Sequence, residues 1–436
     1  MNHQHANGDS ASEPIKASLW LLWPIIIAGE AIFLLPFILP RLFRPSILEA
    51  WQISNLELGF AFSAYGLVAM ICYGLGGPLA DRFSPRLLMC SALISTAIGG
   101  LAMLRTPSPT VLCWLYAYFG MTTILLFWAA MLRVTHNLGG SQQQGTAFGI
   151  LDAGRGLFAA VMATFMTLLF AQLLPKDALP TSADLLSALT WIVSIAITMV
   201  GLAAFLVAIA FRSLPKSQDP TAAKNFEWRS VSPLIRRPAM WLHGLIVLCA
   251  YCGYKSIDNY GIFAVDVYHA TDVQASQLTT LAFWARPFAA IAAGLVADRL
   301  SHFKSLAALF LVTALGNAAL IFVSPVSMPW FGLLMIAVTT AAAVYGLRGI
   351  YFAVFDDLRI PATLVGTAAG IISLVGFLPD VFFGPLTGYL LDSYPGRPGH
   401  QYVFGFVCLL SAIGMIAAIW NGKHLMASRH QDGIPA

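Results

Sequence analysis

Charged side chains are scarce in this chain. Asp, Glu, Lys and Arg make up 10% of its 436 residues, whereas hydrophobic residues make up 58%. A soluble domain typically has about 25% charged residues, and the mean hydropathy here is +0.76. A water-soluble fold could not bury so much apolar surface. Apolar runs of about 20 residues can cross a bilayer as helices, so the composition predicts an all-α membrane protein.

The chain also lacks the marks of several other protein classes. Its six cysteines all lie in apolar runs, which argues against a disulfide framework, and we interpret Cys249-x-x-Cys252 as packing. No G-x-x-x-x-G-K-[ST] loop is present, so the sequence does not support ATP-driven pumping. His136 and His243 have no second ligand at metal spacing. We therefore expect no enzyme activity, no cofactor and no metal. The net charge of +4 is small, and we expect no nucleic-acid partner.

Apolar runs predict twelve membrane-spanning helices in two bundles of six. The first 18 residues are polar, without the basic region or cleavage site of a signal peptide, so we expect a cytoplasmic tail. The predicted organisation is a tail at 1–18, a six-helix bundle at 19–211, a cytoplasmic linker at 212–238, a second six-helix bundle at 239–420, and a tail at 421–436. The predicted spans are 19–40, 58–79, 87–104, 110–133, 145–171, 188–211, 239–264, 275–296, 305–323, 328–352, 364–391 and 402–420.

The basic residues outside the spans predict the orientation. If the N-terminus is cytoplasmic, fifteen Lys and Arg lie on the cytoplasmic side and five, among them Arg41 and Arg44, lie on the other. Cytoplasmic loops carry an excess of Lys and Arg. We therefore expect a multi-pass protein of the inner membrane, monomeric, with both termini in the cytoplasm.

A loop motif occurs twice. Gly-x-x-Ala-Asp-Arg-x-Ser stands at 77–84 and again at 294–301, and Gly-Thr-Ala-x-Gly-Ile stands at 145–150 and 366–371. The separations of 217 and 221 residues indicate a duplicated half, and such repeats are typical of transporters with a site where the halves meet. A carboxylate in this loop could complement the N-terminus of a neighbouring helix. We interpret the loop as a cytoplasmic gate formed by Asp81, Arg82, Arg86, Asp298, Arg299 and Lys304.

The repeated loop and the six-plus-six layout resemble the major facilitator superfamily over residues 19–420. The resemblance implies two six-helix bundles, a central cavity and alternating access. Residues 145–156 and 348–357 are similar to YihN-like permeases, which are grouped near the sugar-phosphate and nitrate/nitrite porters.

Neither substrate of those porter groups transfers to this chain. Organophosphate antiporters have arginines in the first and seventh helices, where this chain has Glu30 and Lys255. Nitrate porters have arginines in helices two and eight; Arg286 matches the second, but helix two offers Ser63 and Tyr65 instead.

Eight ionisable residues lie inside predicted spans. A charge at mid-bilayer costs about 2.5–3.5 kcal/mol on insertion scales, so each should face protein or water beside a partner. Asp152 and Arg155 are three residues apart, as are Lys255 and Asp258, so each pair shares a helix face. The remaining four, which need partners on other helices, are Glu30, Arg286, Arg348 and Asp380, and we expect Asp380 to pair with Arg286 or Arg348.

Glycines recur along the fifth and eleventh predicted spans. Small residues at helical spacing let another helix approach closely. We therefore expect the fifth span to press on the eighth or the tenth, and both sets of glycines to serve close packing. They are Gly145, Gly149 and Gly156 in the fifth span and Gly366, Gly370, Gly376, Gly384 and Gly388 in the eleventh.

These charges predict a secondary active transporter for a small polar or anionic organic solute. We expect the substrate to be bound by Arg155, Lys255, Arg286 and Arg348 with Tyr345 and Tyr351, and a coupling proton to be carried by Glu30, Asp152, Asp258 or Asp380. Proton symport and exchange for a counter-anion stay open. Two alternatives also stay open: a drug-type proton antiporter, which the four interior cations disfavour, and a non-transporting membrane sensor with the same fold.

Overall fold

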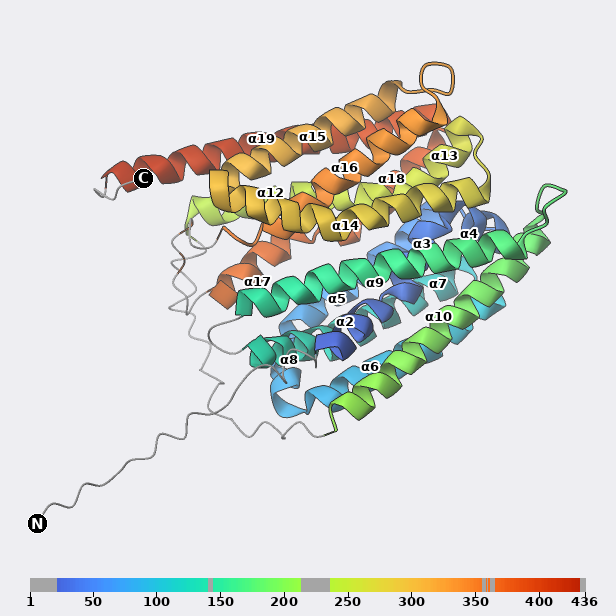
Figure 1. Cartoon of the computed structure of the whole chain (residues 1–436), viewed down its shortest axis with the longest axis horizontal. Coiled ribbons are helices and arrows are strands. Elements are labelled where there is room, and N and C mark those ends of the chain that lie inside the picture. Colours follow the sequence, from blue (N-terminus) through green and yellow to red (C-terminus); the bar gives the residue numbers. More distant parts are fainter. Residues whose placement is uncertain are drawn as a thin grey trace, which may run out of the picture.

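The computed structural model describes residues 22–139, 144–212, 236–354, 358, 360 and 365–431, and these residues form helices and turns without a strand. The predicted tail at 1–18, most of the linker at 212–238 and the last five residues lie outside this part. Figure 1 shows two helical halves, α2–α10 below and α12–α19 above.

The N-terminal half contains twelve helical segments in its described residues. These are α2 (Leu22–Ala31), η1 (Leu34–Ile38), α3 (Leu39–Leu42), α4 (Arg44–Trp51), α5 (Asn55–Arg82), α6 (Pro85–Gly100), η2 (Leu101–Arg105), α7 (Pro109–Gly120), η3 (Met121–Trp128), α8 (Ala129–Gly139), α9 (Gln144–Leu173) and α10 (Ser182–Ala210).

The C-terminal half contains nine in the part that the structure describes. These are α12 (Pro238–Ser256), η5 (Ile257–Asn259), α13 (Tyr260–Tyr268), α14 (Asp272–Leu300), α15 (His302–Phe322), α16 (Trp330–Ile350), α17 (Val365–Gly376), α18 (Pro379–Ser393) and α19 (Arg397–Gln431).

Every predicted span coincides with a helix or a run of helices. Within the described ranges, ten helices are long and apolar enough to cross a membrane, and eleven if the pair 22–31 and 34–42, bent by 42°, is one span. The remaining predicted span, 239–264, is the run from α12 through η5 to α13. Its apolar stretch is interrupted by the short 3-10 turn η5, Ile257–Asn259, and by Lys255 and Asp258.

The sequence repeat is visible in how the helices begin. Ser54 accepts a hydrogen bond from the backbone of Glu57 at the start of α5, and the Glu57 side chain bonds back to Ser54. Thr271 and Gln274 form the same reciprocal cap at the start of α14. The two capping residues are 217 positions apart, which is the separation of the two repeat loops. Such caps satisfy backbone N–H groups that have no partner within the helix, so the duplication is structural as well as sequential.

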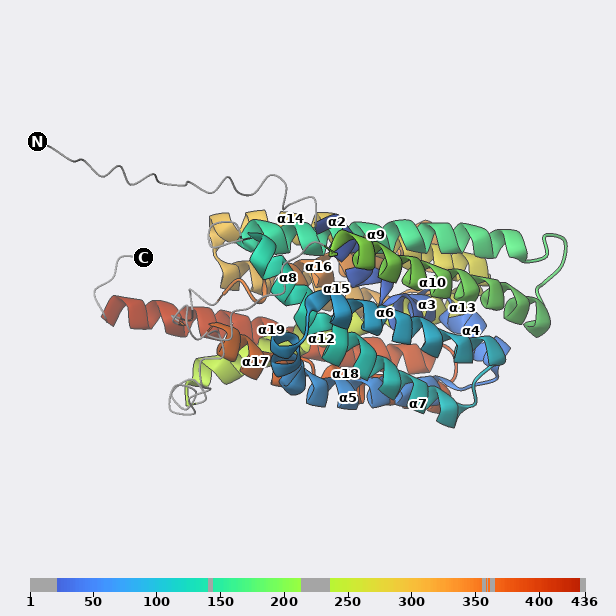
Figure 2. The same cartoon turned by 90° about the horizontal axis from the view of Figure 1, so that it is seen from below.

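Two helix pairs join the halves. α5 packs along α18 and α9 packs along α14, and Figure 2 shows these two pairs on opposite faces of the molecule. The fifth span was expected to approach the eighth or the tenth, and it packs along the eighth. The hydroxyls of Thr167 and Thr280 are 2.9 Å apart across this contact, and Trp284 donates to Thr164 at 2.9 Å.

The halves are in close contact at one end, which we call the tight end: residues 41–59 of the N-terminal half against residues 258–272 and 384–392 of the other. A Cβ placed on Gly59 would lie 2.4 Å from the carbonyl oxygen of Gly384, closer than any real side chain approaches backbone. Small residues permit such backbone contact between membrane helices, and the predicted packing role of Gly384 is confirmed.

Polar contacts join the halves at the tight end as well. The Asp392 carboxylate accepts hydrogen bonds from the backbone N–H groups of Asn55, at 3.2 Å, and Leu56, at 2.8 Å. It therefore caps α5 from the opposite half, where a negative charge complements the helix N-terminus. Ser46 donates a hydrogen bond of 2.5 Å to Asp272.

The opposite end, which we call the repeat-loop end, carries Arg82 and Arg299. There an added Cβ would meet nothing within 4 Å at Gly74 and Gly77 of α5, Gly149 of α9, Gly294 of α14 and Gly370 of α17, so the close packing expected at Gly149 and Gly370 is not found. Among the described residues, the close backbone contacts between the halves lie at the tight end and at mid-depth, and the repeat-loop end is the more open one.

Candidate functional site

A cavity of about 650 Å³ lies between the two halves. This volume is within the usual range of about 300–1,000 Å³ for small-molecule sites. Both halves supply its charged lining, which among the described residues consists of Glu30, Arg41, Asp152, Arg155, Lys255, Arg286, Arg348 and Asp380. Seven of the eight predicted interior charges therefore line it. The eighth, Asp258, lies beside Lys255 and lines a small adjoining hollow.

The first charge cluster crosses between the halves at Glu30, in the last turn of α2. Arg286 of α14 approaches one oxygen of this carboxylate with Nη1 at 2.8 Å, and Arg155 of α9 approaches the other with Nε at 3.1 Å. A second N–H of Arg286 reaches Asp152 at 3.3 Å. One carboxylate thus holds two guanidinium groups, one from each half.

Two glycines make this cluster sterically possible. A Cβ on Gly156 would lie 3.2 Å from Cγ of Arg286, so the bare helix surface gives that side chain its path to Glu30. A Cβ on Gly29 would lie 2.8 Å from the sulfur of Met131 and 3.3 Å from Cδ of Arg155. Arg155 also donates to the Gly29 carbonyl at 3.0 Å. Close packing was predicted for the glycines of the fifth span. At Gly156 the neighbour that packs closely is the side chain of Arg286.

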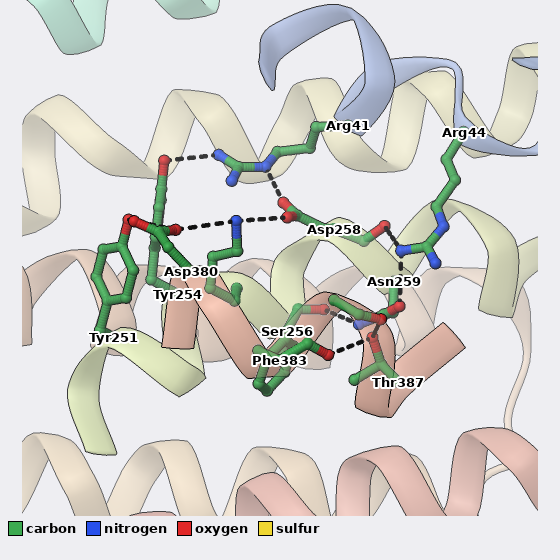
Figure 3. A network of polar contacts seen from close by, with 12 residues as sticks. Arg41, Arg44, Tyr251, Tyr254, Ser256, Asp258, Asn259, Asp380, Phe383 and Thr387 are labelled. Atoms are coloured by element: carbon green, nitrogen blue, oxygen red, sulfur yellow. Dashed lines mark hydrogen bonds and ion pairs between the residues drawn. The ribbon is translucent and has the colours of Figure 1, made fainter. Parts of the chain in front are cut away.

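The second charge cluster surrounds Lys255 near the tight end (Figure 3). The Lys255 ammonium lies 3.4 Å from Asp380 and 3.8 Å from Asp258. Tyr251 donates to both oxygens of Asp380, at 3.1 and 3.0 Å. Asp258 also forms an ion pair with Arg41 of α3, which links this cluster to the N-terminal half.

Helix breaks position the two carboxylates of this cluster. η5 follows α12 directly and turns Asp258 towards Arg41 and Lys255. Asp380 is the second residue of α18, which begins with Pro379, a favoured first helical residue. A Cβ on Gly66 of α5 would lie 2.6 Å from the Asp380 backbone, so this glycine lets α5 reach the break. Broken helices at mid-depth are typical of transport sites.

Arg348 of α16 differs from the other cavity cations. Its guanidinium carbon lies 3.8 Å from the centre of the Tyr254 ring and 5.7 Å from that of Tyr251. It also makes a hydrogen bond with the Tyr351 hydroxyl. In the part of the chain that the structure describes, it forms no ion pair with a carboxylate. Stacking on an aromatic face leaves the remaining N–H groups of the guanidinium able to bind an anion.

The pairing differs from the sequence expectation in two respects. Asp152 and Arg155 do not pair with each other, because Glu30 attracts Arg155 and Asp152 bonds to Arg286. Asp380 was expected to pair with Arg286 or Arg348, whereas its cationic partner is Lys255. The expected pair of Lys255 with Asp258 is confirmed.

Arg41 was misplaced by the sequence prediction, which put it in an outer loop. It is 4% exposed, pairs with Asp258 and donates a 2.9 Å hydrogen bond to the Tyr254 hydroxyl. Arg44 was also assigned to that loop, yet it is 3% exposed and bonds at 2.9 Å to the side-chain oxygen of Asn259. Both are buried because α3 and α4 pack under the C-terminal half instead of ending in solvent.

A signal for Arg41 was present in the sequence. Arg41 and Asp258 are 217 positions apart, the separation of the repeat loops, so they are equivalent positions of the two halves. Equivalent positions near a two-fold axis meet each other. Tyr251 and Tyr254 were also missed. Tyr251 lies four residues before Lys255 and Tyr254 four residues before Asp258, a spacing that places each tyrosine on the same helix face as a charge, but tyrosine alone does not indicate a site.

The two predicted tyrosines both line the cavity. The Tyr345 ring lies 6.1 Å from that of Tyr254, and its buried hydroxyl has no hydrogen-bond partner among the described residues. Tyr351 follows Arg348 by one helical turn.

Among the described side chains, those of the repeat loops form no ion pair between the halves in this structure. Arg82, Arg86, Asp298, Arg299 and Lys304 are exposed, and the Asp298 side chain is 73% exposed with His302 at 4.0 Å. The side chain of Asp81 lies outside the described part.

Comparisons with known proteins agree with this architecture. Inner membrane protein YqcE of Escherichia coli K12 is 26% identical over 395 residues, which cover 88% of this chain and 89% of that protein. Inner membrane protein YihN of the same organism is 24% identical over 413 residues, which cover 93% and 96%.

Solved structures share the fold. The nucleoside transporter NupG superposes with a TM-score of 0.69 at 15% identity, covering 92% of this chain and 99% of that one. A bacterial homologue of the human lysosomal transporter Spinster, in an inward-facing and unoccupied conformation, superposes with a TM-score of 0.70 at 14% identity, covering 94% and 98%. Residues 19–382 match the family model of the Major Facilitator Superfamily. This multi-pass membrane protein therefore belongs to the Major Facilitator Superfamily.

Proposed function

We propose that this protein is a secondary active transporter that moves a small anionic organic solute across the inner membrane by alternating access. The observation that carries the proposal is Arg348, a cavity cation that stacks on Tyr254 and has no carboxylate partner among the described residues. A mid-membrane arginine without a carboxylate partner is costly. A substrate anion would supply that partner.

The N–H edge of the Arg348 guanidinium determines which groups this residue can bind. Its planar fork fits carboxylate or phosphate through two parallel hydrogen bonds. Arg155, Lys255 and Arg286 hold carboxylates in this state, so we propose that they contact the substrate when those ion pairs rearrange. Tyr345 and Tyr351 would contact the body of the substrate.

A coupling proton fits the same network. Glu30, Asp152, Asp258 and Asp380 each pair with at least one cation. Protonation of Glu30 would weaken its hold on Arg286 and so loosen one link between the halves. We therefore propose Glu30 as the first residue to test for coupling, with the other three as alternatives.

The gate and the orientation complete the proposal. With both termini in the cytoplasm, the cavity would open inward and the tight end would face outward. Asp81, Arg82, Arg86, Asp298, Arg299 and Lys304 would then close the cytoplasmic side after the halves rock. A reporter fused after Gly422 should be cytoplasmic, and one inserted near Lys176 should lie on the opposite side. A C-terminus found outside would contradict this topology.

The cavity charges disfavour the alternative of a drug-type antiporter for apolar cations. Five cations and three carboxylates line the cavity among the described residues, which repels a cationic drug. A non-transporting sensor would bind a solute without moving it, so uptake measurements distinguish it.

Thermal-shift binding across neutral, cationic and anionic solutes tests the anion proposal. Hydrogen bonds to a charged group contribute about 1.5–3 kcal/mol, so Arg348→Gln should weaken anion binding roughly 10- to 100-fold. Arg348→Lys should bind with intermediate affinity, because it keeps the charge and loses the fork. Arg105→Gln, which removes an exposed cation far from the cavity, is the matched control. A neutral or cationic best ligand that Arg348→Gln still binds normally would overturn the proposal.

A further inference from the structure

Among the described residues, the charges that line the main cavity, counted together with Asp258, which forms ion pairs with two of them, include one more positive than negative charge. The cations are Arg41, Arg155, Lys255, Arg286 and Arg348, and the carboxylates are Glu30, Asp152, Asp258 and Asp380. Every carboxylate pairs with at least one of the first four cations, and none pairs with Arg348. The excess charge is therefore located at Arg348.

Arg44 does not alter this account. It lines the adjoining hollow with Asp258 but not the main cavity, and it lies on the far side of Asp258 from Tyr254 and Asp380 (Figure 3). It contacts the backbone carbonyl of Asp258, at 3.5 Å, and forms no ion pair with a carboxylate among the described residues. Its guanidinium bonds to the side-chain oxygens of Asn55 and Asn259, both at 2.9 Å.

We infer that the cavity selects singly charged anions over both neutral solutes and dianions. This inference rests on the proposed function and adds to it the charge of the substrate. One negative charge neutralises Arg348 and leaves the site electrically balanced. A neutral solute leaves that cation unpaired, and a dianion brings a second charge that must lose its water without a partner, which is costly away from solvent.

The side chains around Arg348 suit a monocarboxylate whose body carries hydroxyl groups or an aromatic ring. Tyr251 and Tyr254 lie against the guanidinium, and Tyr345 packs on Tyr254. The hydroxyls of Tyr251 and Tyr254 already bond to Asp380 and Arg41. The hydroxyl of Tyr345 has no partner among the described residues. A buried polar group without a partner favours a ligand that supplies one.

Two series of compounds with a constant carbon skeleton test this inference. Glucitol, gluconate and glucarate carry zero, one and two negative charges, as do 1,2-benzenedimethanol, 2-(hydroxymethyl)benzoate and phthalate. Affinities for the full-length protein in detergent should be highest for the singly charged member of at least one series. If anions bind and the dianion binds as tightly as the monoanion, this inference fails while the anion proposal survives. If no anion in either series binds, the proposed function fails with it.

A single substitution should change the preferred charge. Asp152 pairs with Arg286 at 3.3 Å and its side chain is 52% exposed, so Asp152→Asn keeps the shape and removes one negative charge. The excess charge rises by one, and the affinity for a dianion relative to the monoanion should increase about tenfold or more. Asp177→Asn, in an exposed loop, is the control and should leave that ratio unchanged.

Arg348→Gln should act in the opposite direction. It removes the excess charge, so the affinity for the neutral member relative to the monoanion should rise about tenfold or more. An unchanged dianion-to-monoanion ratio in Asp152→Asn would overturn the inference, as would an unchanged neutral-to-monoanion ratio in Arg348→Gln.

Discussion

The backbone contact between α5 and α18 should be a point at which one methyl group changes the conformational equilibrium. In Gly59→Ala, the new Cβ would lie 2.4 Å from the Gly384 carbonyl oxygen, whereas ordinary contact begins at 3.4 Å. The two helices must separate by about 1 Å, because neither atom belongs to a side chain that can rotate away. Each helix belongs to a different half, so the strain is relieved when the tight end opens.

The size of the effect follows from packing energetics. Overpacking of a close contact typically costs about 1–3 kcal/mol. If that cost falls on the state with a closed tight end, the open-to-closed ratio there should rise roughly 5- to 150-fold. Transport should slow, because the protein would favour one state.

Thiol labelling at Ser46 can measure this shift. Ser46 is 1% exposed and bonds across the tight end to Asp272, so Ser46→Cys should react with a water-soluble thiol reagent when that end opens. We expect faster labelling in the Gly59→Ala background. Gly201→Ala is the control, because a Cβ there meets nothing within 4 Å. The labelling of the native cysteines is measured in the same two backgrounds without Ser46→Cys and is subtracted. Equal labelling rates in Gly59→Ala and Gly201→Ala would refute the reasoning.

The cavity cluster, the tight end and the repeat loop each yield a further prediction. Gly156→Ala should displace Arg286, whose Cγ would lie 3.2 Å from the new methyl group, and should lower uptake several-fold without removing a charge. Normal uptake would contradict the proposed role of Gly156 in admitting Arg286. Arg41→Gln should lower the melting temperature, since removing one partner of a buried pair costs about 3–5 kcal/mol. An unchanged melting curve would show that Asp258 is stable without Arg41 as its partner. Asp298→Asn should reduce uptake but leave thermal stability in this open state unchanged, because the side chain is 73% exposed here; wild-type uptake would count against the gate.

Much of the fold could be predicted from the sequence, because lipid imposes a simple rule. In the bilayer core a helix satisfies all of its backbone hydrogen bonds internally, so an apolar run of sufficient length is good evidence for a span. The repeated loop then indicated two halves. The bend in the first span was not predicted, although Pro36 lies in the π-helical segment η1, Leu34–Ile38, just beyond the bend.

The residues of the site could be predicted better than their pairing. An ionisable residue in a span is a functional candidate wherever it lies, which is why seven of eight line the cavity. The partner of each charge depends on how the halves pack. Asp152 and Arg155 share a helix, yet Gly156 admits Arg286 between the halves and changes both pairings. Arg41 was missed because the predicted end of the first span fell just before it and so moved it from a helix to a loop.

Uptake into proteoliposomes by the wild-type protein and by Arg348→Gln tests the central claim most directly. The account predicts that a singly charged organic anion from the binding panel accumulates inside wild-type vesicles. It predicts that Arg348→Gln, reconstituted in equal amount, takes it up at roughly a tenth of that rate or less, since a charged hydrogen bond of about 1.5 kcal/mol or more is lost. Equal uptake by the two proteins, or uptake of a neutral or cationic solute in preference to every anion, would contradict it.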